Sequence, residues 1–548
     1  MVGGLAATAT AAPDGAAPPR EALRERVEAL RGERGPGGEA QTAARALIAG
    51  LYEARGFEPL WTDAGRVASL RRAIDASVTH GLDPRDYHAT ALGATPARGD
   101  GDALARRELL LTDALVRLAY HLHFGKADPR SLQPSWNFTR TLGGADPAAA
   151  LARLATAPDP AAALELLAPS LPAYADLRRV LAALRETERR GGWMPVPAGP
   201  KLEAGMTERS DDPRLAALRQ RMAESGDLAA ADAAAPEPSN VAPAQSFDAA
   251  LAEAVQRFQA RHGLEIDGVV GRATLAAMNL PAAARIDQVR ANLERLRWVA
   301  RDLVGDHLLV DIAGFEARPW LDGREAWRSR VVVGRPYRRT PEFRSTMEYL
   351  VLNPEWGVPP TVLRNDVLPR VLRDRGYLER QRMRLIDRTG RVVDPHSVDW
   401  DAVRQRPSAF PYRVVQASGP ENALGRMRFM APNEHLVFLH DTPARELFER
   451  PVRAFSSGCI RVERPLELAV LLLDDAERWS AQQLAETIDA GRTHTLPLRR
   501  RVPLLLLYHT ARAGDDGLPA FRPDLYGRDA PIVRALAAPF RFAAVARR

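Results

Sequence analysis

Cysteine is almost absent from this chain of 548 residues, which contains a single one, Cys459. One thiol cannot form a disulfide within the chain, and it cannot supply the several sulfur ligands of a thiolate-rich zinc or iron–sulfur centre. Three roles remain for Cys459: an inert core residue, a surface residue without a function, or a nucleophile. The rest of the sequence has to distinguish among them.

Lysine is nearly missing as well, since only Lys126 and Lys201 occur, and arginine therefore carries almost all of the positive charge. The formal net charge is +7, but the arginines are scattered among acids and form no basic stripe or recognition module. The sequence therefore argues against a nucleic-acid partner, although a net positive charge favours encounter with an anionic polymer.

Long apolar runs are also absent. No segment approaches the roughly 18 residues that a membrane-spanning helix needs, and residues 503–508 (PLLLLY) have only the length of a strand. The hydrophobic fraction of 46% and the charged fraction of 26% are those of a soluble globular protein. Because a chain of this length exceeds one hydrophobic core, we expect a multidomain α+β protein of about three or four domains.

The first two segments of the chain differ in composition. Residues 1–40 are rich in Gly, Ala and Pro, and we expect them to be flexible; residues 1–13 end in an A-x-A-like stretch that fits the remnant of a signal peptide or plain disorder. Residues 41–197 have the apolar spacing of helices, broken at Asp–Pro pairs, and we expect a helical scaffold domain. His121 and His123 lie two positions apart there, on different helix faces, so they are not expected to bind a metal.

Residues 198–282 form a second unit. We expect a helix at about residues 213–222, a low-complexity linker at 229–246, and a second helix on which Leu251, Val255 and Phe258 share one stripe. The pattern AVQRFQxxxGLxxDGxxGxxT resembles the peptidoglycan-binding-like domain. The resemblance implies a wall-binding or spacer module, whereas the residues alone predict a small helical bundle.

Residues 283–530 change to a β-rich pattern, followed by a C-terminal tail at 531–548. Short aliphatic runs between turns predict strands at residues 307–312, 329–333, 349–352, 435–439 and 504–508. Residues 360–411, with a helical start at 362–372, interrupt this pattern. An inserted segment of that size is expected to form a lid over a groove.

A nucleophilic role for Cys459 requires a partner, because a free thiol is only about 3% thiolate at pH 7. His440 is the candidate, since it ends a predicted strand and lies 19 positions before Cys459, enough for a loop to return. His435, at the start of that strand, would lie about 16 Å away. Gly458 allows unusual backbone angles, and its amide and that of Cys459 could stabilise an oxyanion. Spacing and chemistry alone leave a structural and a catalytic cysteine both open.

Two segments, 439–443 (LHDTP) and 453–462 (RAFSSGCIRV), are similar to the signature of the L,D-transpeptidase catalytic domain, in particular of the large multidomain subgroup of Gram-negative bacteria. The same subgroup is matched by TPEF at 340–343, NPEWGVP at 353–359, GPENALG at 419–425, YHTA at 508–511 and FRPDLYGRD at 521–529. Together with the helical region, the resemblance covers about residues 45–530.

The resemblance implies a cysteine acyltransferase that needs no cofactor and no metal. A thiolate–imidazolium pair of Cys459 and His440 would attack the bond between the third residue of a peptidoglycan tetrapeptide stem and its terminal D-Ala. The amides of Gly458 and Cys459 would hold the oxyanion, and an amine of a second stem would resolve the thioester into a cross-link between third-position diamino acids. Carbapenem-type β-lactams are expected to acylate the same cysteine.

The resemblance also carries expectations for the neighbouring residues. Most relatives have a histidine at the position of Ser457, whereas the large subgroup tends to have a serine there, as this chain does. His440 is therefore the sole matching base. The resemblance implies that a backbone carbonyl orients it, with Asp441 as the positional candidate, although the Asp441 carboxylate could equally cap the turn. The expected substrate-binding residues, each with a structural alternative, are Ser457, Arg461, Trp356, Asn422 and Tyr508. Arg461 would hold a carboxylate of the substrate or of the protein, Trp356 would stack or pack, Asn422 would fix a loop, and Tyr508 would lie in the wall or the core.

Three rival classes of function stay open, and a serine hydrolase is a weaker fourth. The chain could be a non-catalytic wall-binding scaffold, or an L,D-carboxypeptidase or protein-attaching enzyme with the same two residues. A thiol peptidase is disfavoured because His440 precedes Cys459, and a serine hydrolase because no G-x-S-x-G elbow occurs. The enzyme hypothesis places the protein in the periplasm, either after signal cleavage or anchored to the inner membrane through a segment upstream of residue 1.

Overall fold

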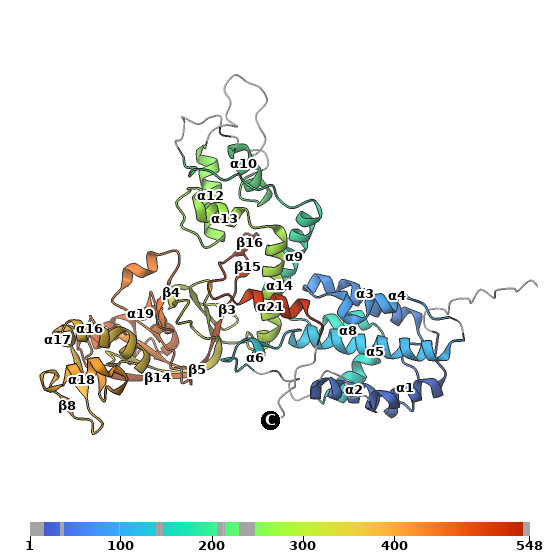
Figure 1. Ribbon diagram of the computed structural model, residues 1–548, viewed down its shortest axis with the longest axis horizontal. Coiled ribbons are helices and arrows are strands. Elements are labelled where there is room, and N and C mark those ends of the chain that lie inside the picture. The colour runs from blue at the N-terminus through green and yellow to red at the C-terminus, as the bar shows by residue number, and fades with distance from the viewer. Residues whose placement is uncertain are drawn as a thin grey trace, which may run out of the picture.

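The structure is a computed structural model that describes residues 16–32, 38–97, 99–138, 140, 142, 146–204, 212, 214–229 and 247–540. Figure 1 shows three arms that meet at the helix α14 (Ala282–Val299): a helical domain, a small helical unit, and a β-rich domain with an inserted segment at its far end. The expected multidomain α+β architecture is confirmed. Among the described residues, no helix combines the length and apolar character that crossing a membrane requires.

The helical domain begins earlier than expected. Residues 1–40 were expected to be flexible, but residues 20–32 form the helix α1, in which Leu23 and Val27 are fully buried. The four-residue spacing of these two side chains gives the helix an apolar face that packs on α2 and α5. The helices of the domain are α1 (Arg20–Gly32), α2 (Gly38–Ala54), α3 (Ala64–Ala76), α4 (Ala89–Gly93), α5 (Gly101–Phe124), α6 (Pro129–Leu132), α7 (Pro147–Ala155), α8 (Pro160–Glu165) and α9 (Pro172–Arg189).

The second unit contains the predicted helices, and its expected linker at 229–246 lies almost wholly outside the described residues. Leu251, Val255 and Phe258 are fully buried in its core, as their spacing predicts. A backbone bridge between Leu202 and Val270 closes the unit. Its helices are α10 (Arg214–Glu224), α12 (Ala249–Arg261) and α13 (Arg272–Met278).

The junction of the three arms is α14, which packs on α9 of the helical domain and on α21 (Asp529–Ala537) near the C-terminus. Glu294 and Arg297 of α14 are completely buried and form an ion pair. The expected tail at 531–548 is wrong for its described part, since Ile532 and Leu536 of α21 are buried in the core of the helical domain. Residue 283 is therefore not a clean domain boundary.

The β-rich domain is built on a ten-stranded sheet of order β12-β4-β13-β11-β10-β5-β14-β1-β2-β3. Pairing is parallel for β1–β14, β11–β13 and β12–β4 and otherwise antiparallel. The strands are β1 (His307–Asp311), β2 (Glu316–Leu321), β3 (Arg324–Glu325), β4 (Ser329–Gly334), β5 (Phe343–Leu352), β10 (Met427–Met430), β11 (Leu439–His440), β12 (Ala454–Ser456), β13 (Ile460–Val462) and β14 (His494–Leu507). The helices α19 (Pro465–Leu473) and α20 (Ala481–Asp489) and the hairpin β15 (Ala511–Ala513) and β16 (Pro519–Phe521) complete the domain.

One expected strand is much shorter than predicted. Residues 435–439 have strand-like composition, but only Leu439 and His440 pair with neighbours. Leu436 adopts φ +53°, a left-handed conformation that an extended strand cannot contain, and its side chain is exposed. The chain therefore turns just before His440 instead of running straight into it.

The inserted segment has a hydrophobic core of its own, separate from that of the large sheet. Its four-stranded sheet has the order β6-β9-β7-β8 and is covered by short helices. The elements are β6 (Trp356–Gly357), α15 (Pro360–Val362), the π-helical turn η5 (Leu363–Val367), α16 (Leu368–Arg373), α17 (Tyr377–Arg380), β7 (Met383–Ile386), β8 (Val392–Val393), α18 (Trp400–Gln405) and β9 (Arg413–Gln416). The segment is thus a subdomain with defined structure.

Packing of α1 can be tested by a single substitution. We expect Leu23→Ala to destabilise the helical domain by about 2–4 kcal/mol, because a fully buried leucine leaves a cavity, whereas Arg24→Ala, with 52% of its side chain exposed, should change stability by less than about 0.5 kcal/mol. Hydrogen exchange of α1 and α2, together with thermal unfolding, measures both effects. Equal behaviour of the two variants would show that α1 does not dock as described.

Candidate active site

The candidate site lies on one face of three neighbouring strands. His440 of β11 is the register partner of Arg428 on β10 and of Arg461 on β13, so the three side chains share a face. Leu439, one residue earlier, points to the opposite face and is buried in the hydrophobic core. Cys459 precedes Arg461 by two positions, and the alternation of a strand therefore directs it to the same face as His440.

A closed turn holds Cys459. The Ser456 hydroxyl donates to the Cys459 carbonyl (2.6 Å) and accepts from the Gly458 amide (3.0 Å). The Thr340 hydroxyl donates to the Gly458 carbonyl (2.8 Å) and accepts from the Gly334 amide (2.9 Å). Gly458 has φ +123°, which a residue with a side chain rarely adopts.

This turn corrects one expectation about the oxyanion hole. The Gly458 amide was expected to face the oxyanion, but it is already bonded to the Ser456 hydroxyl, because a serine two residues earlier can close such a turn locally. The Cys459 amide has no hydrogen-bond partner within the described part of the chain. Cys459 therefore supplies the free backbone donor, and Gly458 supplies the backbone angle that presents it.

The ring of His440 is oriented by its own neighbour. Nδ1 donates to the backbone carbonyl of Asp441 (2.5 Å), which leaves Nε2 as the nitrogen that can accept a proton. The Asp441 carboxylate accepts from the Arg426 amide (2.8 Å) and the Arg445 guanidinium (2.6 Å). Gly425 permits this approach, since a Cβ there would lie 2.4 Å from the carboxylate. The Asp441 carbonyl orients His440 and the Asp441 carboxylate caps the turn, so Asp441 has both of the roles that the sequence suggested for it.

The charge state differs from the expected thiolate–imidazolium pair. Burial, followed by the nearby Arg461 guanidinium, lowers the pKa of His440 to about 3. Burial also raises the pKa of the Cys459 thiol, against the opposing effects of the Phe438 backbone and the arginines. Both shifts favour a neutral thiol and a neutral imidazole in the free site. The thiol donates to the Leu436 carbonyl (3.8 Å), and no hydrogen bond joins it to His440 among the described residues.

Two of the expected substrate-binding residues are structural. Asn422 is 1% exposed, its side-chain amide donates to the Ala417 carbonyl (2.9 Å), and its oxygen accepts from the Leu424 amide (2.8 Å). Because the Leu424 backbone lies beside His440, Asn422 fixes the loop next to the imidazole. Its side-chain amide and oxygen are both bonded within the protein, which favours the loop-fixing alternative over a direct contact with a substrate.

For Tyr508 the structure favours the core, one of its two expected positions. It is completely buried, its hydroxyl donates to Asp524 (2.9 Å), and it accepts from the Tyr526 amide (2.9 Å). The Tyr526 hydroxyl in turn donates to the Gly334 carbonyl (2.5 Å) and accepts from the Thr340 amide (3.3 Å). Tyr508 thus supports the turn at Cys459 from the core through Tyr526 and Thr340.

Trp356 packs on the inserted segment, and Ser457 is connected to it through Arg338. Trp356 is partly buried against its hydrophobic core, which favours the packing alternative. The Ser457 hydroxyl accepts from Arg338 (2.8 Å), and Arg338 also forms a two-pronged ion pair with Asp366 of η5. A single guanidinium therefore connects the inserted segment to the residue that precedes Gly458.

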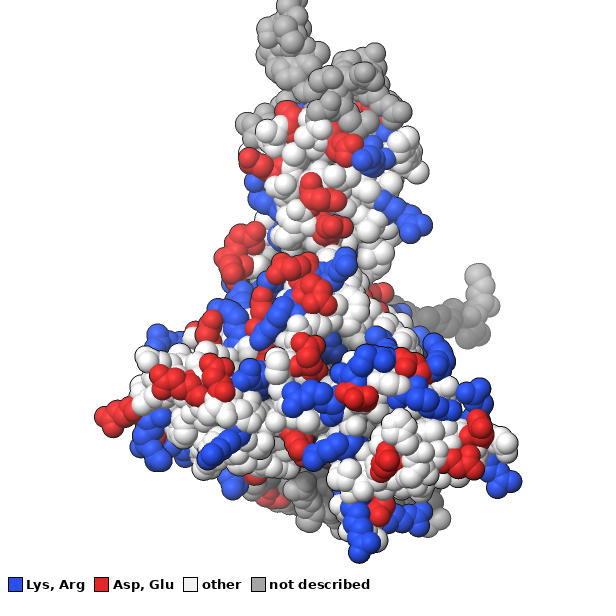
Figure 2. All heavy atoms as spheres, turned by 90° about the vertical axis from the view of Figure 1, so that its left-hand side faces the viewer, with Lys and Arg blue, Asp and Glu red and all other residues white. Residues whose placement is uncertain are grey.

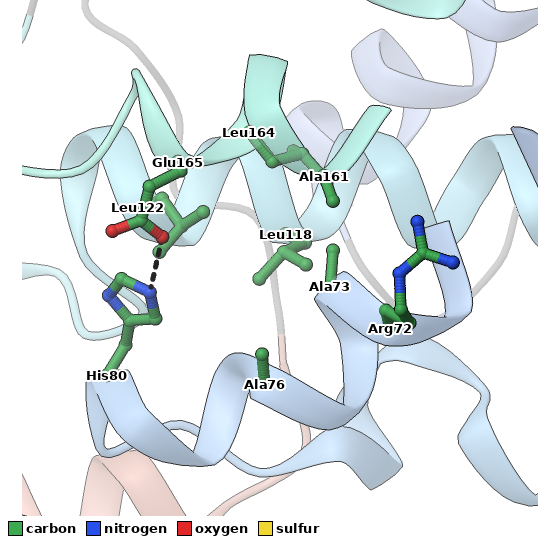
Figure 3. Close-up of a pocket in the computed structure, with 9 residues that line it drawn as sticks. All are labelled: Arg72, Ala73, Ala76, His80, Leu118, Leu122, Ala161, Leu164 and Glu165. Carbon is green, nitrogen blue, oxygen red and sulfur yellow. Dashed lines mark hydrogen bonds and ion pairs between the residues drawn. The ribbon is translucent and has the colours of Figure 1, made fainter. Parts of the chain in front are cut away.

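The helical domain contains a separate cavity of about 160 Å³, shown in Figure 3. Apolar side chains of α3, α5 and α8 line most of it, and an ion pair between His80 and Glu165 (3.2 Å) closes one end. None of the candidate catalytic residues lines it. The described residues also contain no group of three or more His, Cys, Asp or Glu side chains that could hold a metal ion.

Three family models match the chain. Residues 305–493 match the "L,D-transpeptidase catalytic domain", residues 214–278 the "Putative peptidoglycan binding domain", and residues 46–181 the "Scaffold domain". The chain contains an L,D-transpeptidase catalytic domain. The expected resemblance of residues 198–282 to the peptidoglycan-binding-like domain is confirmed by the second of these matches, and the inserted segment lies within the range of the first.

The comparison with individual proteins gives one curated relative and one solved structure. A Haemophilus influenzae protein described as a "Putative L,D-transpeptidase" is 37% identical over 241 residues, which cover 44% of this chain and 48% of the relative. The chain thus spans about half the length of that relative. A solved L,D-transpeptidase fragment (residues 123–326) from Xylanimonas cellulosilytica is 14% identical, with a TM-score of 0.18, and the match covers 57% of this chain and 99% of the fragment.

Some residues of the site were not predicted as functional. Thr340 belongs to a matched motif but has no local sign of its contact with Gly458, which is 118 positions away. Arg338 likewise gives no sign of its contact with Ser457. Arg428 alternates with the buried Met427 and Phe429, a pattern that could have placed it on the face opposite the core.

Cys459 is the only thiol of the chain, so its titration can be followed directly. Because burial raises its pKa, alkylation by iodoacetamide should increase with a midpoint above about 8.5, the value of a free thiol. Arg461→Met should raise the midpoint further, since this guanidinium favours the thiolate, and His440→Ala should leave it nearly unchanged. A midpoint below about 7 that His440→Ala abolishes would instead show a preformed ion pair.

Proposed function

We propose that the chain is a peptidoglycan L,D-transpeptidase that acts through a Cys459 thioester. The thiol attacks the carbonyl that joins the third residue of a tetrapeptide stem to terminal D-Ala, while Nε2 of His440 takes the thiol proton. The tetrahedral intermediate collapses, the C–N bond breaks, and His440 returns the proton to the D-Ala amine. The observation that carries the proposal is that Cys459 and His440 lie on the same face of the sheet. Nδ1 of His440 is bonded to the Asp441 carbonyl, which leaves Nε2 available as the base.

The second half-reaction uses the same residues in reverse. The side-chain amine of a diamino acid in a second stem attacks the thioester, and His440 takes a proton from this amine. The thiol leaves with a proton, and the product is a cross-link between two third-position residues. In both halves the Cys459 amide donates to the oxyanion, a contribution of about 10²–10³ in rate for a well-placed donor.

A neutral resting pair is compatible with this mechanism. A neutral imidazole can act as general base at the moment of attack, and proton transfer of this kind contributes about 10²–10⁴ in rate. The low pKa of His440 keeps it in the base form throughout the neutral range. The thiol is likewise protected from adventitious oxidation, because the reactive thiolate is scarce until a substrate is bound.

We further propose that the inserted segment is a lid that keeps water away from the thioester. Hydrolysis competes with aminolysis, so an enzyme that makes cross-links must exclude water from the acyl-enzyme. The support is the pair of contacts from Arg338, to Asp366 of the segment and to Ser457 beside the thiol turn. Ser457 thus acts by holding Arg338, in place of a direct contact with the substrate.

The setting of the reaction follows from its substrate. Peptidoglycan lies outside the inner membrane, and we therefore propose a periplasmic enzyme, with residues 198–282 as a wall-binding or spacer unit. The face of the molecule in Figure 2 has Lys and Arg interspersed with Asp and Glu instead of gathered in a basic stripe, so no continuous polyanion site is evident on that face. Carbapenems, which present a strained amide to the same thiol, are proposed as covalent inhibitors.

The chemical test is intact-mass spectrometry after incubation with disaccharide tetrapeptides and, separately, with a carbapenem. Wild type should gain an acyl adduct and yield dimers linked between third-position residues. Cys459→Ala should give no adduct, and His440→Ala should slow acylation by about 10²–10⁴. His435→Ala is the matched control and should behave as wild type.

Other outcomes of this experiment would identify one of the rival functions. An adduct that yields only shortened monomers would contradict cross-linking and establish a carboxypeptidase. Transfer of the stem to a protein amine would establish protein attachment. No adduct with either reagent would leave the non-catalytic scaffold as the better account.

The lid can be tested through the partition of the acyl-enzyme. Arg338→Ala should raise the ratio of hydrolysed to cross-linked product by about tenfold, because a lost ion pair of roughly 1–2 kcal/mol frees the segment. Asp366→Asn should have the same direction of effect, whereas Arg364→Ala, an exposed arginine of the same turn, should leave the ratio unchanged. Muropeptide analysis measures the ratio of hydrolysed to cross-linked product. An unchanged ratio in both Arg338→Ala and Asp366→Asn would contradict the lid.

A further inference from the structure

Two arginines flank the candidate catalytic pair without a protein partner. Arg428 and Arg461 lie on either side of His440 in the register of the sheet. Neither guanidinium donates a hydrogen bond to any of the described residues, and Nε of each is buried without a partner. Both act electrostatically on the Cys459 thiol and on His440, which places them close to the reacting atoms.

The fully buried arginines elsewhere in the described part of the chain have acceptors. Arg297 pairs with Glu294, Arg528 donates to Glu342 (2.8 Å), and Arg295 pairs with Asp529 (2.6 Å). Those without an acid use backbone carbonyls; two examples are Arg221 and Arg285. A guanidinium that is partly removed from water and has neither kind of acceptor is costly to keep, so the pair beside Cys459 needs a function.

The surroundings of the two guanidinia fit an anion that arrives from outside the chain. The charged groups that act on Arg461 are Arg335, which repels it, and the weaker Glu446, together with the Cys459 thiol. The Arg428 guanidinium lies over the Phe438 ring, with its Cζ 4.1 Å from the ring centroid, and this contact restricts its position. A fixed planar fork is the geometry that recognises a carboxylate with two parallel hydrogen bonds.

We propose that Arg428 and Arg461 form a carboxylate-binding site for the C-terminal carboxylate of the donor stem. This inference rests on the proposed function, because it assumes that Cys459 attacks a peptide bond. In a donor whose last peptide bond is attacked, the terminal carboxylate carbon lies three bonds from the attacked carbonyl carbon, within about 4 Å. A carboxylate this near to the reacting carbonyl can reach guanidinia that lie on the same sheet face as the thiol.

The site selects substrates by their length. A stem that continues beyond the fourth residue has a neutral amide where the tetrapeptide has its carboxylate, and binding it would leave both guanidinia without an acceptor. Leaving buried polar groups unpaired is the most effective way for a site to reject a near-identical substrate. Arg428 and Arg461 would therefore restrict attack to the last peptide bond of the stem.

The test compares two donors that differ only at this group. Disaccharide tetrapeptides with a free C-terminal carboxylate and with a C-terminal carboxamide are titrated into Cys459→Ala protein by calorimetry, so that no turnover occurs. The free acid should bind at least about tenfold more tightly than the amide. Arg428→Met and Arg461→Met, each combined with Cys459→Ala, should abolish this preference while amide binding stays the same, and Arg364→Met should retain it.

The outcomes separate this inference from the proposed function. Equal binding of acid and amide, a preference that survives both arginine substitutions, or no measurable binding of either donor at millimolar concentration would overturn the carboxylate site. Acylation of wild type is followed in parallel by intact mass. Thioester formation at equal rates from acid and amide overturns the site and leaves the function intact, whereas a preference in binding without any thioester overturns the function alone. Circular dichroism confirms the fold of each variant.

Discussion

Parallel pairing of β11 with β13 is the constraint on which the candidate active site depends. The register that sets Leu439 against Ile460 buries both in the core, and it thereby places His440 and Arg461 on the other face, two positions from Cys459. A shift of one residue would exchange the two faces and bury the imidazole among aliphatic side chains. The hydrophobic core thus determines the geometry of the polar site.

Electrostatics decides how such a site can react. The two guanidinia favour a thiolate at Cys459 and oppose an imidazolium at His440, while burial opposes both charges. A neutral pair is the consequence, and ionisation is postponed until a substrate supplies a carbonyl to attack. The surrounding framework, from Thr340 and Tyr526 behind the turn to Arg338 in front of it, holds the turn in place without adding charge to the thiol.

Sequence alone predicted the parts of the protein that are encoded locally. Cys459 immediately precedes β13 and His440 ends β11, so their placement on one sheet face follows from short motifs beside two paired strands. For Tyr508 the sequence left the core and the wall of the groove both open, because its hydrogen-bond partner, 16 positions further along, is brought to it only by the fold. Arg428 was missed because the lack of an acceptor is a property of the folded neighbourhood. The helix at residues 20–32 was missed because the composition of the whole segment hid a four-residue apolar repeat.

The central claim is that Cys459 carries the stem as a thioester. The most direct measurement is ¹³C NMR of wild-type protein with a tetrapeptide labelled at the carbonyl of its third residue, recorded under single-turnover conditions. The account predicts a transient protein-bound thioester carbonyl signal that disappears when an acceptor amine is added and never forms in Cys459→Ala. Conversion of the labelled amide directly to product, with no thioester at any time, would contradict it.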